Sequence, residues 1–275
     1  MTETNLGSAG IARESVVGPH GVHVAAHGPE STSDTTTLLF VHGAHCGSWV
    51  WERLIPQFAD DGWPCVAIDF RGHYLSERIP DAELAALSIH DYVDDLDAVA
   101  HSIAGNVVVV AHSVGGLVAL KHAEIGTKRP VGLALFAPAP PANVGGYNFP
   151  SYGERSPVPP FDAQLSRHWF FYDVDPADLD RYVDLLGPES AVLLNQSGRN
   201  EVDVSPARVS GPICVFAGEN DTIQGGIGAG LDLRIARCYG AEYVMLPGQG
   251  HMMLIENGWE QSVDALQRWL KRTFP

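Results

Sequence analysis

The stretch that decides the fold is VVVVAHSVGG, at residues 107–116. Its four consecutive valines predict a buried strand, and the residues from Gly116 onward predict the start of a helix. A serine on a sharp turn between a strand and a helix presents its hydroxyl to a cleft, and the next backbone N–H points into the same space. Ser113 is therefore a candidate nucleophile, and an ordinary Ser-Val-Gly-Gly loop is the alternative.

Ala111 departs from the usual form of this turn, which has glycine two residues before the serine. Small residues are needed there because the turn brings the strand and helix backbones close together. Alanine meets that need, so the departure leaves the interpretation of Ser113 in place.

The rest of the chain predicts seven more strands. Two short alternating segments around a Gly-Pro-His-Gly turn predict a β-hairpin, and apolar runs separated by helical patterns predict the others. Runs this uniformly apolar indicate strands covered by helices on both faces. The predicted class is α/β, with a mostly parallel eight-stranded sheet between helices, and the predicted strands are 15–17, 22–26, 37–41, 65–70, 107–111, 132–136, 214–217 and 243–246.

Two helices carry recognisable start signals. Ser88 and Asp91 form a predicted capping box for a helix that Gly105 ends. Asn257, with Glu260 three residues later, predicts the start of a C-terminal helix. Its predicted buried face consists of Trp259, Val263, Leu266, Leu270 and Phe274.

More than seventy residues separate the strand that ends at Phe136 from the strand that begins at Cys214. This span is too long for a loop and too short for an independent domain, and its pattern is helical from about residue 162 to 199. It predicts a mainly helical lid inserted over one end of the sheet. The expected organisation is a mobile tail at 1–13, a core at 14–138 and 211–275, and a lid segment at 139–210.

Composition limits the function classes. The 275 residues are 45% hydrophobic and carry a net charge of −16, which disfavours nucleic acid and anionic membranes as partners. No apolar run reaches the roughly 18 residues of a membrane span, and the N-terminus lacks a signal-peptide pattern. Neither the four cysteines nor the twelve histidines have metal-site spacing. We expect a cytoplasmic monomer or homodimer that acts on a small molecule without metal or cofactor.

A serine nucleophile needs a base. His251 follows the last predicted strand in a glycine-rich loop, which allows an imidazole to fold back over the strand ends. A surface histidine is the alternative interpretation. His112 is expected to point away from the cleft into the packing, and His42 is expected to brace a loop by hydrogen bonds. His251 is therefore the preferred base.

The base in turn needs an orienting acid. Asp221 follows the strand at 214–217 and is the preferred candidate, with Glu219 as its nearest rival. Asp69, at the end of an earlier strand, is expected to tie down a turn with Arg71, which is a structural role.

A developing oxyanion needs backbone donors, each typically worth about 3–4 kcal/mol of transition-state stabilisation. One expected donor is the N–H of Val114, directly after the serine. The other is the N–H of Ala44, in the glycine-bearing turn after the strand at 37–41.

With these pieces in order, the chain resembles an α/β-hydrolase from about Val16 to Phe274. The resemblance rests on the serine turn, on the order Ser113, Asp221, His251, and on the segments 42–43, 69–73, 218–221 and 250–251. The segment 42–49 is also similar to the oxyanion turn of plant methylesterases and hydroxynitrile lyases. In that group the residue matching Ala44 supplies an oxyanion N–H. The resemblance implies the α/β-hydrolase fold with a lid.

The resemblance also narrows the chemistry. Epoxide hydrolases and haloalkane dehalogenases of this fold attack with a carboxylate, where this chain has Ser113. The similar lyases carry a threonine and a lysine where this chain has Gly43 and Gln249-Gly250. Hydrolysis of an ester or lactone through an acyl-enzyme is therefore expected first. The alternatives are C–C bond hydrolysis, cofactor-free perhydrolysis and a non-catalytic small-molecule receptor.

Aromatic residues of the lid segment are the sequence's indication of the substrate. A run of them at 169–172 predicts an apolar pocket wall, although some of these rings must instead dock the lid onto the core. A compact hydrophobic or aromatic substrate is expected. The candidate substrate-binding residues are His45, at a pocket entrance, and Trp169, Phe170, Tyr172 and Met252.

Overall fold

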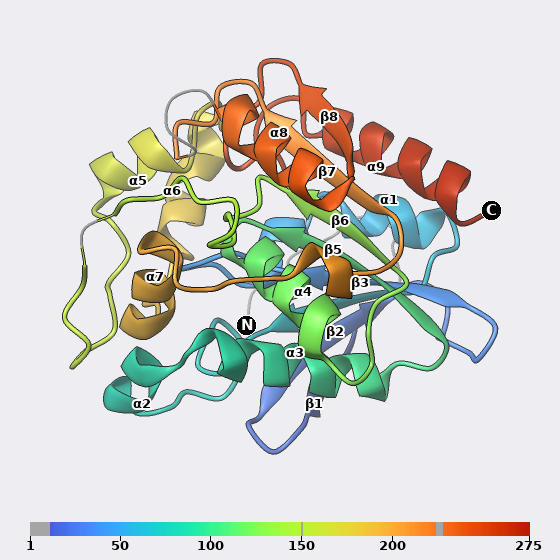
Figure 1. The fold of residues 1–275 in the computed structure, drawn as a ribbon, viewed down its shortest axis with the longest axis horizontal. Coiled ribbons are helices and arrows are strands. Elements are labelled where there is room, and N and C mark those ends of the chain that lie inside the picture. Colours follow the sequence, from blue (N-terminus) through green and yellow to red (C-terminus); the bar gives the residue numbers. More distant parts are fainter. Residues whose placement is uncertain (1–11, 150, 224–227) are drawn as a thin grey trace.

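A computed structural model describes residues 12–149, 151–223 and 228–275 of the chain. Eight strands form one sheet in the order β1-β2-β4-β3-β5-β6-β7-β8 (Figure 1). The strand β2 pairs antiparallel with both β1 and β4, and every other pairing is parallel. The predicted mostly parallel eight-stranded sheet is therefore confirmed. The strands are β1 (Arg13–Val17), β2 (Val22–His27), β3 (Thr36–Val41), β4 (Cys65–Asp69), β5 (Asn106–His112), β6 (Gly132–Phe136), β7 (Ile213–Gly218) and β8 (Glu242–Leu246).

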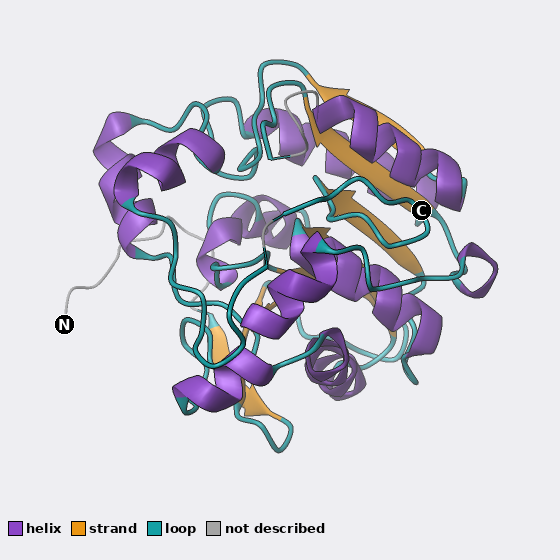
Figure 2. Cartoon of the chain, turned by 60° about the vertical axis from the view of Figure 1, so that its left-hand side comes forward, coloured by secondary structure: helices purple, strands orange, loops and turns teal. Residues whose placement is uncertain are grey.

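Helices lie on both faces of the sheet (Figure 2). Side chains alternate across β3: Leu39 and Val41 join the apolar cluster on one face, and Leu38 and Phe40 join the cluster on the other. Residues of α3, α4 and α8 belong to the first cluster, and residues of α1 and α9 belong to the second. The helices of the core are α1 (Ile55–Asp60), α2 (Asp81–Ala86), α3 (Ile89–Ser102), α4 (Val114–Ile125), α8 (Gly228–Tyr239) and α9 (Glu260–Thr273).

The expectation that every apolar strand is covered on both faces is wrong for β8. Glu242 and Met245 of this strand are exposed, and its other residues except Leu246 are only half-buried. The reason is position, because β8 is the last strand of the sheet and pairs with β7 alone.

The two predicted helix starts have different outcomes. Ser88 and Asp91 form the expected capping box of α3. The C-terminal helix α9 begins at Glu260 rather than at Asn257. Gly258 has a φ of +83°, which interrupts a helix, and Asn257 is held outside it by hydrogen bonds to Asp173 of the lid segment. Val263, Leu266 and Leu270 are buried as predicted, and Trp259 and Phe274 are half-buried.

The lid segment leaves the sheet after β6 and returns to it at β7. It contains α5 (Ala163–Trp169), α6 (Pro176–Asp184) and α7 (Ala191–Gly198), which lie together beside the sheet (Figure 1). Asp162, Asp175 and Ser190 cap the three helices, each by accepting a backbone N–H at the helix start. The predicted helical span is therefore three short helices, and α7 packs against α2.

The expected N-terminal tail lies almost wholly outside the described residues, since residues 1–11 are not described and Arg13 already begins β1. Among the described helices, none is both long enough and apolar enough to cross a lipid bilayer.

Candidate active site

Ser113 lies on the sharp turn between β5 and α4, as the sequence predicts. Its φ of 54° and ψ of −125° belong to a region that residues other than glycine rarely adopt. The crowding around the turn explains the glycines after it. A Cβ on Gly115 would lie 2.3 Å from the carbonyl oxygen of His42, and one on Gly116 would lie 2.6 Å from Cβ of Pro138. Only glycine fits at these two positions.

Ala111, the departure from the usual turn, lies in β5 with its side chain fully buried. The strand pairs in register with β3 up to this residue and with β6 up to His112. The methyl group joins the apolar cluster that also contains residues of α3 and α4, so the sheet accommodates alanine here.

The structure brings Ser113, His251 and Asp221 together. His251 Nε2 lies 3.1 Å from Ser113 Oγ, and His251 Nδ1 lies 2.7 Å from Asp221 Oδ2. An imidazole that donates its Nδ1–H to a carboxylate keeps a lone pair on Nε2, which accepts the serine proton. Asp221 Oδ1 accepts the N–H of Ile223 at 2.9 Å. This arrangement suits a nucleophile, a base and an orienting acid.

The three side chains meet because parallel strands end at one edge of the sheet. Ser113 follows β5, Asp221 follows β7, and His251 follows β8. The loops after β7 and β8 touch, since a Cβ on Gly218 would lie 2.3 Å from the carbonyl oxygen of Gly250. Glu219, the rival acid, is exposed and accepts the N–H of Gly248 instead, so the structure favours Asp221.

His112 is buried, as expected, but its contact is with the candidate base. Its Nε2–H donates to the carbonyl oxygen of His251 at 3.0 Å, and the two rings lie 4.7 Å apart. Burial lowers the pKa of His112 well below its usual value, so this imidazole is neutral. The sequence shows only a histidine beside the serine and does not indicate that it supports the loop after β8.

Glu256 is a second supporting residue, and the sequence does not indicate its role. Its two carboxylate oxygens accept the N–H groups on either side of His251, from Gly250 at 2.5 Å and from Met252 at 3.1 Å. It also accepts the N–H of Tyr172 in the lid segment at 3.3 Å. A buried carboxylate thus holds the loop that carries the candidate base.

Burial raises the pKa of Glu256 to about 7, against the opposing effect of the three donated N–H groups. A carboxyl whose pKa is higher in the folded than in the unfolded chain stabilises the fold most below the unfolded pKa, and this stability is lost as pH rises through the folded pKa. From about pH 5 to pH 8.5, the wild type should therefore lose up to about 3 kcal/mol of unfolding free energy that Glu256→Gln does not lose. Melting temperatures of the two proteins at both pH values measure this.

The matched control is Glu219→Gln, which removes an exposed carboxylate near the same loop. A melting-temperature difference between wild type and Glu256→Gln that stays constant from pH 5 to pH 8.5 would contradict the assignment of Glu256.

The expected oxyanion donors belong to two segments that adjoin the serine. Val114 is the first residue of α4, and the first N–H groups of a helix have no acceptor within it. On the other side, Gly43 is pressed against the serine, because a Cβ on it would lie 2.8 Å from Ser113 Cβ. Ala44 follows in a turn that the N–H of Cys46 closes by donating to Gly43.

His42 braces this turn, as the sequence predicts. Its Nδ1–H donates to the carbonyl oxygen of Gly43 at 2.8 Å, and its Nε2 accepts the N–H of Phe70 at 3.2 Å. This pattern requires a neutral ring, and burial lowers the pKa of His42 to about 4.

The expected pairing of Asp69 with Arg71 is wrong. Asp69 accepts hydrogen bonds from His23 Nδ1 at 2.9 Å and from the N–H of Ser48. Arg71 turns to α3, where its guanidinium donates to the buried carboxylate of Asp95. Asp95 is buried on α3, and a buried carboxylate needs charged donors, which the guanidinium of Arg71 supplies.

The candidate substrate-binding residues lie at different depths. Phe170 is 9% exposed, and its ring lies 6.2 Å from that of His251 and 6.5 Å from that of His45. His45 is buried against the lid segment rather than at an entrance, with its Nδ1–H donating to the carbonyl oxygen of Gly187. Met252 is fully buried. Among the lid aromatics that the structure describes, Phe170 alone is placed beside the candidate base by a ring contact.

Trp169 and Tyr172 are the outlying members of the candidate set. Trp169 is 38% exposed and its indole packs edge-on against His168. Tyr172 is 55% exposed, although its Cβ lies close to Gly250 in the loop of the candidate base. The expectation that Trp169 lines the pocket finds no support in its position.

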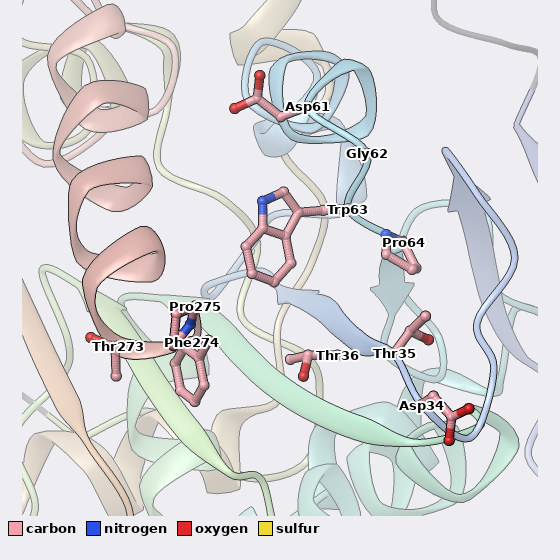
Figure 3. Close-up of a pocket in the computed structure, with 10 residues that line it drawn as sticks. All are labelled: Asp34, Thr35, Thr36, Asp61, Gly62, Trp63, Pro64, Thr273, Phe274 and Pro275. Atoms are coloured by element: carbon pink, nitrogen blue, oxygen red, sulfur yellow. The ribbon is translucent and has the colours of Figure 1, made fainter.

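A surface hollow of about 620 Å³ lies elsewhere (Figure 3). It is lined by Thr36 and Pro64, next to the amino ends of β3 and β4, and by Phe274 after α9. Ser113 follows the carboxyl end of β5, at the opposite edge of the sheet. This hollow is therefore separate from the candidate active site.

No group of three or more His, Cys, Asp or Glu side chains within residues 12–149, 151–223 and 228–275 is arranged to hold a metal ion. The hydrogen bonds of the candidate site join a serine, a histidine and a carboxylate.

Comparisons with known proteins agree with this architecture. A model of the alpha/beta hydrolase family matches residues 38–265. An esterase from Thermogutta terrifontis is 20% identical with a TM-score of 0.72, covering 97% of this chain and 100% of its own. A methylesterase from Arabidopsis is 17% identical with a TM-score of 0.70, covering 86% of this chain and 99% of its own. A bromoperoxidase from Bacillus anthracis is 14% identical with a TM-score of 0.70, covering 94% and 99%. No match was found among curated proteins.

Proposed function

Because the chain belongs to the alpha/beta hydrolase family, we propose that it is a serine hydrolase that cleaves an ester or lactone of a compact hydrophobic or aromatic molecule. The observation that carries the proposal is the continuous hydrogen-bonded chain from Ser113 Oγ through His251 to Asp221. A fold in this family hosts many reactions, so the argument rests on these side chains rather than on the fold.

In the first half of the reaction, Ser113 Oγ attacks the carbonyl carbon of the substrate while its proton passes to His251 Nε2. Asp221 stabilises the imidazolium that forms. The carbonyl oxygen becomes an oxyanion, which accepts hydrogen bonds from the N–H groups of Ala44 and Val114. His251 then gives the proton to the leaving alcohol oxygen, and the acyl group remains on Ser113.

In the second half, water takes the place of the alcohol. His251 Nε2 removes a proton from the water as its oxygen attacks the acyl carbon, and a second oxyanion forms on the same two donors. When this intermediate collapses, the ester bond to Ser113 breaks and the proton returns to Ser113 Oγ. The acid is released, and for a lactone it carries the alcohol group within the same molecule.

The apolar surroundings of the site support a compact hydrophobic substrate. Phe170 stacks on Phe161 with ring centroids 5.7 Å apart, and both rings lie within 6.5 Å of the His45 ring. Such a wall favours an apolar acyl or alcohol group over a charged one. The esterase neighbours from Thermogutta terrifontis and Arabidopsis are in accord with ester hydrolysis.

Turnover of p-nitrophenyl butyrate tests the proposal, together with labelling of Ser113 by a fluorophosphonate. We expect release of p-nitrophenol at a rate that saturates with substrate, and a covalent adduct located on Ser113 by mass spectrometry. Absence of both turnover and labelling would support a non-catalytic receptor instead. Turnover with an adduct on another serine would refute the assignment of Ser113.

Phe170→Ala should raise KM for p-nitrophenyl butyrate about tenfold with a smaller change in kcat, because an apolar contact of this kind contributes roughly 1–3 kcal/mol. Trp169→Ala is the matched control, since this neighbouring side chain is exposed and packs on His168. We expect it to change KM less than twofold. Equal effects of the two substitutions would contradict the position of Phe170 as the pocket wall.

A further inference from the structure

Glu189 is a buried acid that the proposed reaction does not use. It belongs to the lid segment, just before α7, and only 1% of it is exposed. Burying a carboxylate is costly unless its oxygens accept several hydrogen bonds. Its partners therefore indicate why an acid is present at this position.

Four donors meet the Glu189 carboxylate. Oε1 accepts the His73 Nε2–H at 3.1 Å, the N–H of Ser190 at 2.7 Å and the hydroxyl of Tyr92. From the described residues, Oε2 accepts one hydrogen bond, from the N–H of His45 at 3.1 Å. Every one of these donors lies on an element outside the lid segment except Ser190.

The cluster contains an ion pair between His73 and Glu189. His73 Nδ1 faces the carbonyl oxygen of Arg71 at 3.0 Å, and Nε2 faces the carboxylate, so both ring nitrogens carry protons. In agreement, the negative charge of Glu189 raises the pKa of His73 against the effect of burial, and His73 holds the pKa of Glu189 below its usual value. An ionised Glu189 accepts from all four donors at once.

His45 is the residue that links this cluster to the candidate oxyanion hole, because it directly follows Ala44. Its φ of 64° is unfavourable for a residue other than glycine, so its surroundings must hold it there. The lid segment does so at three points. Glu189 accepts the N–H of His45, the N–H of Gly187 donates to the carbonyl oxygen of His45, and Gly187 accepts the His45 Nδ1–H.

We propose that Glu189 is a positioning residue through which the lid segment sets the oxyanion turn. The carboxylate holds the peptide between Ala44 and His45 through the N–H of His45. Because the next peptide toward the N-terminus carries the N–H of Ala44, fixing the first peptide orients this N–H toward the developing charge. The inference rests on the proposed function, since it assigns Ala44 to the oxyanion hole. It differs from that function in giving the lid a part in transition-state stabilisation besides substrate binding.

Glu189→Gln tests this inference because a glutamine amide has one accepting oxygen, whereas both carboxylate oxygens of Glu189 accept hydrogen bonds. Its oxygen accepts best where three donors meet, which leaves its NH₂ group facing the N–H of His45. The contact with the oxyanion turn is thus the one that is lost. Misplacing one oxyanion donor lowers kcat about 10- to 100-fold, and KM should change less than threefold.

A second readout separates positioning from general stability. A trifluoromethyl ketone forms a tetrahedral adduct with Ser113 and places its oxygen anion on the oxyanion donors, so its inhibition constant should rise by the same factor as kcat falls. The matched control is Tyr182→Phe, which removes a part-buried hydrogen bond between the lid segment and Glu52 of the core and keeps the ring that stacks on Trp49. It should change kcat and the inhibition constant less than twofold.

The outcomes are distinct. A wild type without ester turnover overturns the proposed function and this inference with it. An active wild type whose Glu189→Gln variant keeps its kcat, or loses no more than Tyr182→Phe, overturns the inference alone. If Glu189→Gln does not fold, Tyr92→Phe removes one donor from Glu189 and should lower kcat about threefold at constant KM; an unchanged kcat there overturns the inference.

Discussion

Ser113→Ala is expected to lower kcat for p-nitrophenyl butyrate by about 10⁴- to 10⁶-fold. The variant keeps the oxyanion donors and the pocket but has no oxygen that can bond to the acyl carbon. His251 Nε2, now 3.1 Å from the position of a missing hydroxyl, has no proton to accept. Steady-state kinetics and intact-protein mass spectrometry measure the loss of turnover and of the acyl adduct.

Ser197→Ala is the control for this substitution. Ser197 is also a buried serine, in α7 of the lid segment, and it lies outside the site. Its kcat should stay within twofold of the wild type. A Ser113→Ala variant that retains a tenth of wild-type turnover would show that the acyl chemistry takes place on another residue.

Asp221→Asn should lower kcat by about 10⁴-fold with the fold intact. The carboxylate accepts the His251 Nδ1–H at 2.7 Å and thereby keeps the proton off Nε2. An asparagine amide in the same position donates to Nδ1, which moves the ring proton to Nε2. That nitrogen then faces Ser113 Oγ as a donor and cannot accept the serine proton.

Kinetics and structure together test this account. KM should change less than kcat, and the melting temperature should stay near that of the wild type. Glu219→Gln is the matched control, because Glu219 is the nearby acid that the sequence left as a rival and the structure places at the N–H of Gly248. If Glu219→Gln lowers kcat as much as Asp221→Asn does, the acid has been assigned wrongly.

The most accurate predictions from the sequence concern features that are local. The four valines before Ser113 predict β5, and the glycines after it predict the turn, because both follow from backbone sterics over a few residues. The capping box of α3 is local in the same sense. The start of α9 was predicted three residues early because the contact of Asn257 with Asp173 joins positions 84 residues apart.

The order of the site residues along the chain also carries information. Parallel strands end at one edge of the sheet, so Ser113, Asp221 and His251 were expected to meet once each had been placed after a strand. The same argument did not separate Asp221 from Glu219, since both follow β7. The structure distinguishes them, because Asp221 accepts the His251 Nδ1–H and the exposed Glu219 accepts the N–H of Gly248.

Sequence alone determined the fold class, the serine turn and the set of groups from which a nucleophile, a base and an acid are drawn, because backbone periodicity and strand ends are encoded in neighbouring residues. Tertiary structure alone decided how these groups are held. Glu189 meets His45 across 144 residues, and His112 meets His251 across 139. Such contacts exist only after burial has brought distant segments together, where a carboxylate or an imidazole must find partners because water is absent.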